Sequence, residues 1–62
     1  MGAMLHNEDI IKMAMAGLDD ALIIAKISSS KCQFDMSTDA LIQLTNSGIS
    51  AVVLKAMTGS GR

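Results

Sequence analysis

The 62-residue chain contains no proline, tryptophan or tyrosine, and it has one phenylalanine, one cysteine and one histidine. A single cysteine cannot form a disulfide within the chain, so the fold is not that of a disulfide-stapled secreted domain. The sequence also lacks the alternation of β-branched and polar residues, and the tight turn pairs, that indicate β-hairpins. Hydrophobic residues nevertheless make up 50% of the chain. This composition predicts one small all-α domain, close to the lower size limit for a self-sufficient core.

Charge and hydropathy exclude several classes of partner. Five basic residues against six acidic residues give a net charge of −1, so no strong field attracts DNA, RNA or an anionic membrane. The longest apolar run covers residues 21–25, whereas a membrane-spanning helix needs about 18 or more apolar residues. No signal-peptide pattern is present. We expect no membrane span, and the compartment (cytoplasm or cell envelope) stays open because it depends on the parent protein.

Two three-residue segments, 17–19 and 48–50, share one design and lie 31 positions apart. Each has a glycine, then a large aliphatic residue, then a residue that commonly caps a helix. Glycine adopts the left-handed conformation that ends a helix, and Asp or Ser accepts a backbone N–H at the next helix start. Each segment therefore predicts a corner between two helices, and the corner residues are Gly17, Leu18, Asp19, Gly48, Ile49 and Ser50.

The corners divide the chain into two helix–turn–helix hairpins. We expect hairpin one at 7–29, a link at 30–36 and hairpin two at 37–58, together forming a four-helix bundle over 5–58. Residues 1–4 are interpreted as a cloning remnant and 59–62 as a flexible tail. Six positions agree at the offset of 31, which indicates an internal pseudo-repeat: Ile10, Met13, Gly17, Leu18, Leu22 and Ile23 correspond to Leu41, Leu44, Gly48, Ile49, Val53 and Leu54.

The link contains the only aromatic residue, Phe34. Cys32, Phe34 and Met36 alternate with polar residues, so an extended link places all three side chains on one side. We expect Phe34 to fill the space between the two hairpins.

No group of residues carries recognisable catalytic or metal-binding chemistry. His6 and Cys32 are each the only residue of their type, whereas a metal site needs several converging ligands and a reactive thiol needs a base. The adjacent Asp19 and Asp20 are explained by helix capping and the helix dipole. The second helices of the hairpins carry only Lys26 and Lys55, with no Arg or Gln to contact base edges. We expect no enzyme activity, no cofactor and no metal, and we consider nucleic-acid binding unfavourable.

Five apolar residues remain after one face of each helix has been assigned to the core. Some of them can form an exposed patch, which in a soluble protein commonly marks a binding surface; alternatively, all five pack internally. We therefore predict a protein–protein interaction or oligomerisation module that binds a protein partner or a second copy. The alternatives are a nucleic-acid-binding helix–turn–helix module and a bundle that binds a small apolar ligand or lipid. The five predicted partner-binding residues are Ile11, Met15, Ile24, Ile42 and Val52.

From residue 5 to residue 57 the chain resembles a short bacterial helical module. The resemblance rests on 7–13 (NEDIIKM), 16–18 (AGL), 22–27 (LIIAKI), 34–35 (FD), 37–38 (ST), 40–44 (ALIQL), 48–50 (GIS) and 55–57 (KAM). Such modules occur alone or attached to other bacterial domains, often in envelope proteins. The resemblance implies an accessory helical module of a larger bacterial protein and names no reaction. The chain departs from the module's usual lysines and acidic residues at Met15, Thr45, Asn46, Ala51 and Val52.

Overall fold

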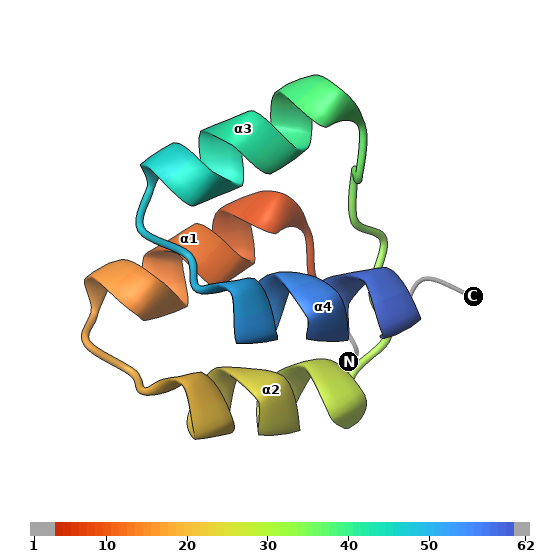
Figure 1. Cartoon of the computed structure of the whole chain (residues 1–62). Coiled ribbons are helices and arrows are strands. Elements are labelled where there is room, and N and C mark those ends of the chain that lie inside the picture. The colour runs from red at the N-terminus through yellow and green to blue at the C-terminus, as the bar shows by residue number, and fades with distance from the viewer. Residues whose placement is uncertain (1–3, 61–62) are drawn as a thin grey trace.

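The computed structural model describes residues 4–60, which form four helices without a sheet (Figure 1). The prediction of a small all-α bundle is confirmed. Helices α1 and α3 run in one direction and α2 and α4 in the other, and the link lies at the opposite end from both corners (Figure 1). None of the helices in this described part is long and apolar enough to cross a membrane. The helices are α1 Asn7–Met15, α2 Asp20–Ser28, α3 Thr38–Asn46 and α4 Ala51–Ser60.

The first corner has the hydrogen bonds of a Schellman motif. The Leu18 N–H donates to the Met13 carbonyl and the Gly17 N–H donates to the Ala14 carbonyl, each at a distance of 3.1 Å. Gly17 has φ 92°, in the left-handed region where a Cβ is unfavourable. Asp19 then begins the next helix, because its Oδ1 accepts the Leu22 N–H at 2.8 Å. The predicted roles of this corner's backbone and cap are confirmed.

The second corner repeats this geometry. The Ile49 N–H donates to the Leu44 carbonyl at 3.1 Å and the Gly48 N–H to the Thr45 carbonyl at 3.0 Å. Gly48 has φ 91°, within one degree of its counterpart in the first corner. Helices α1 and α2 start at residues 7 and 20, and α3 and α4 start at 38 and 51, each 31 positions later. The pseudo-repeat read from the sequence is therefore also a repeat of helix starts.

The residues before α1 pair with the link. Leu5 donates its N–H to the Lys31 carbonyl at 2.9 Å and accepts the Gln33 N–H at 2.8 Å, forming a short parallel bridge. The Asn7 side chain continues the pairing: its Nδ2 donates to the Asp35 carbonyl at 2.8 Å, and its Oδ1 accepts the Asp35 N–H at 3.0 Å. These bonds hold the start of hairpin one against the segment that leads to hairpin two.

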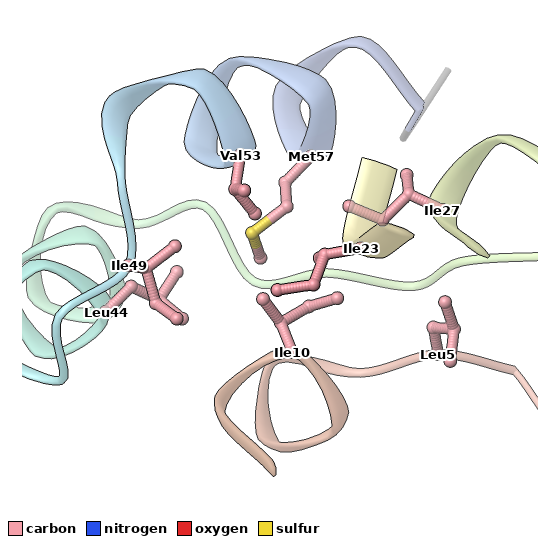
Figure 2. Close-up of a cluster of buried hydrophobic side chains, with 8 residues drawn as sticks. All are labelled: Leu5, Ile10, Ile23, Ile27, Leu44, Ile49, Val53 and Met57. Carbon is pink, nitrogen blue, oxygen red and sulfur yellow. The ribbon is translucent and has the colours of Figure 1, made fainter. Parts of the chain in front are cut away.

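The core forms where α2 packs against α4 and α1. Figure 2 shows Met57 reaching from α4 toward Ile10 of α1 and Ile23 of α2. All three side chains are at most 2% exposed. The arrangement therefore buries apolar surface from both hairpins in one cluster, which consists of Leu5, Ile10, Ile23, Ile27, Leu44, Ile49, Val53 and Met57.

Phe34 does not occupy the centre of this cluster. It is half-buried and packs against the outside of the core, as do Cys32 and Met36, while the intervening Gln33 and Asp35 are exposed. The predicted alternation along the link is confirmed, but the prediction that Phe34 fills the space between the hairpins is wrong. The link runs along the surface at the ends of the helices, so its side chains reach only the margin of the core.

The ends of the chain differ in part from the expectation. Helix α4 continues through Gly59 and Ser60, which the sequence analysis assigned to a flexible tail. Met4, assigned to the cloning remnant, precedes the bridge and is 44% exposed. Residues 1–3 and 61–62 lie outside the described residues.

Candidate interaction surface

The five predicted partner-binding residues fall into two groups. Ile11 and Ile24 are half-buried and pack against the core. Met15 is 79% exposed, Val52 56% and Ile42 54%. Only the second group is mainly exposed. Ile11 and Ile24 follow directly after the fully buried Ile10 and Ile23, so the core extends to cover part of each side chain.

Two further exposed apolar residues lie at the first corner and in the first turn of α2, and neither is among the predicted binding residues. Leu22 is 57% exposed and Leu18 is 36% exposed. Leu22 corresponds to Val53 in the pseudo-repeat, yet Val53 is only 1% exposed. Because residues 21–25 of α2 are all apolar, hydrophobic periodicity could not show which side of this helix is buried.

Four of these exposed residues come from elements that lie at one end of the molecule. Both corners are at this end (Figure 1), with the last residue of α1 before the first corner and the first turns of α2 and α4 after the two corners. Ile42 is separate, in the middle of α3. We use the name corner surface for Met15, Leu18, Leu22 and Val52.

A hydrogen bond between the hairpins connects the two corners. The Ser50 Oγ donates to the Asp20 Oδ2 at 2.9 Å, and it also accepts the Val53 N–H at 3.4 Å. One hydroxyl therefore caps α4 and joins it to the start of α2. Together with the two Schellman motifs, this bond holds the elements that carry the corner surface in a defined arrangement.

The polar residues singled out in the sequence have structural partners. The Cys32 Sγ lies 3.5 Å from the Ile27 carbonyl oxygen and 3.4 Å from that of Ser30, and the side chain is half-buried. Asp19 caps α2 and Asp20 accepts from Ser50. Among residues 4–60, no three His, Cys, Asp or Glu side chains are grouped so that they could hold a metal ion.

Two surface cavities lie away from the corner surface. One, of about 340 Å³, is lined by polar residues at the start of α1 and in the link, together with Ala40 and Gln43 of α3. The other, of about 400 Å³, lies between the C-terminal ends of α2 and α4 and is lined by Ile27, Ser28, Ser30, Ala56 and Gly59. Neither of these two cavities is lined by a corner-surface residue.

No protein family, curated protein or solved structure shows a significant match to this chain.

Proposed function

We propose that this chain is a non-catalytic protein–protein interaction or oligomerisation module and that the corner surface is its contact surface. The observation that carries this proposal is the exposure of Met15, Leu22 and Val52, each more than half exposed, on elements at one end of the molecule. Grouped apolar side chains on a small domain are typical of interaction surfaces. Following the resemblance, the module is an accessory part of a larger bacterial protein.

The energetics support a contact of moderate strength. Removing one such side chain from water contributes about 1–2 kcal/mol, since each is already partly covered. The elements beneath the surface are held by the caps, the Schellman bonds and the Ser50–Asp20 hydrogen bond, so little backbone ordering accompanies binding. Met15 adds a flexible side chain that adapts to differently shaped partners.

The experiment compares two double variants that add the same charge. Met15→Lys/Val52→Lys places two ammonium groups on the corner surface, and Ser28→Lys/Gln43→Lys places them at exposed helical positions outside it. Self-association is measured by light scattering after size exclusion, and partner capture by pull-down from a lysate of the source organism. We expect the first variant to lose the association and the control to keep it. If the first variant changes neither self-association nor capture, the corner surface is not the contact surface.

A further inference from the structure

Equivalent positions of the pseudo-repeat are not equally buried. Val53 is 1% exposed, whereas its counterpart Leu22, 31 positions earlier, is 57% exposed. Ile49 is 6% exposed and its counterpart Leu18 is 36% exposed. Hairpin one therefore carries apolar residues at the positions of Val53 and Ile49, and the rest of residues 4–60 covers them less than it covers those two counterparts.

The complementary difference appears on the other side of these helices. Ile27 of α2 is 2% exposed, whereas its counterpart Thr58 of α4 is exposed. Ile23 is 2% exposed and its counterpart Leu54 is half-buried. Helix α2 thus contacts α4 through the side that carries Ile23 and Ile27. Helix α4 uses a side that is shifted by one position relative to the equivalent side of α2, which is a rotation of about 100° around the helix axis.

Contact through non-equivalent sides is a head-to-tail contact. A two-fold contact buries the same residues on both partners, whereas a head-to-tail contact leaves one unused side at each end. In this chain the less covered sides are those of Leu18 and Leu22 on hairpin one and, on hairpin two, that of the exposed Thr58 and of Leu54, which the core covers in part. Stacked repeat proteins normally close their ends with polar outer faces, and Leu18 and Leu22 are not polar.

We propose that copies of this chain associate head to tail, with the Leu54 and Thr58 side of α4 in one copy covering Leu18 and Leu22 of the next. This inference rests on the proposed function and names its partner as a second copy. The contact between α2 and α4 within one chain is the model for the contact between copies, because it already joins the corresponding sides of the two helices.

Three differences make the contact between copies weaker than the internal one. Lys26 stands where hairpin two has the buried Met57, so only its aliphatic stem can cover apolar surface. Ala51 stands where hairpin one has Asp20, so the hydrogen bond donated by Ser50 has no equivalent. Thr58 also offers less apolar surface than Ile27. We therefore expect weak association, and the measurement extends to about 1 mM.

The test uses one charged variant on each side. Leu22→Lys blocks the hairpin-one side and Thr58→Lys blocks the hairpin-two side; both positions are exposed, so circular dichroism should be unchanged. Leu22→Gln provides a second variant that keeps helix propensity without a charge. Light scattering is run on the wild type, on each variant and on an equimolar mixture of the two lysine variants.

Head-to-tail association predicts species larger than a dimer for the wild type, monomers for each lysine variant, and a 1:1 heterodimer in the mixture. The heterodimer forms because each variant retains the side that the other lacks. A wild-type dimer that is lost in Leu22→Lys but kept in Thr58→Lys is a two-fold contact and overturns the proposal. A wild type that is monomeric throughout also overturns it. Partner capture that depends on Met15 and Val52 then still supports the proposed function.

Discussion

The Ser50 Oγ donates a 2.9 Å hydrogen bond to the Asp20 Oδ2, although the two residues are 30 positions apart. Ser50 is the cap of α4 and Asp20 is the first residue of α2. The bond therefore joins the starts of α2 and α4, the two helices with the most extensive contact in the fold. The hydroxyl has two roles, a local cap and a contact between hairpins, which substitution can separate.

We expect Ser50→Ala to lower the free energy of unfolding by about 1–2 kcal/mol, because it removes both the cap and the contact. Asp20→Ala keeps the α4 cap and removes the exposed contact together with the carboxylate's interaction with the α2 dipole, so it should cost less, about 0.5–1 kcal/mol. Urea denaturation followed by circular dichroism measures both. The double variant completes a cycle, and additive losses in it would show that the two side chains do not interact.

We expect Gly17→Ala and Gly48→Ala each to lower the free energy of unfolding by about 1–2 kcal/mol, because alanine is strained at φ near +90°. A Cβ at either glycine meets no atom within 4 Å, so the cost is conformational and not steric. Gly59→Ala is the matched control. It lies within α4, also with open space around it, and should be neutral or stabilising by up to about 1 kcal/mol. Thermal melts compare the three variants, and equal effects would contradict the strain argument.

Val52 and Val53 are neighbours of the same type with opposite environments, at 56% and 1% exposure. Val53→Ala removes buried methyl groups and leaves a cavity, so we expect a loss of about 2 kcal/mol. Val52→Ala should change stability by less than about 0.5 kcal/mol, since alanine favours the helix slightly more than valine does. Urea denaturation distinguishes the two variants. A similar loss for both would mean that α4 buries a different side.

The Asn7 side chain pairs with both backbone polar groups of Asp35. We expect Asn7→Ala to cost about 1 kcal/mol and to speed amide hydrogen exchange at Asp35, since that N–H loses its acceptor. Asn7→Asp keeps the acceptor but loses the Nδ2 donor. It should therefore protect the Asp35 amide while still lowering stability. Unchanged exchange at Asp35 in Asn7→Ala would show that this pairing does not form in solution.

The helix boundaries and corners could be predicted because their causes are local. A glycine followed by a leucine or isoleucine and then a cap contains the Schellman ending and the next helix start within a few residues. Both glycines have the expected left-handed conformation. The offset of 31 strengthened the prediction, since two independent segments indicated the same corner.

The buried sides of the helices could not be predicted in the same way. Residues 21–25 of α2 and 51–54 of α4 are apolar on every side, so packing between helices selects the side that is buried. Leu22 was missed as an exposed residue for this reason. Leu5 entered the core through backbone pairing with residues 31–33, a long-range contact that no local pattern indicates. Phe34 was misplaced because its aromatic character suggested a central position.

The two halves are no longer interchangeable, although they share corners and helix starts. A chain in which residues 20–28 were copied into positions 51–59 would keep the local signals for a helix and its cap. It would also put the Lys26 ammonium at position 57, where Met57 is 0% exposed, and burying that unpaired charge would cost several kcal/mol, roughly the stability of a small domain. If the halves arose by duplication, their backbones have stayed the same while each has become dependent on the other's side chains.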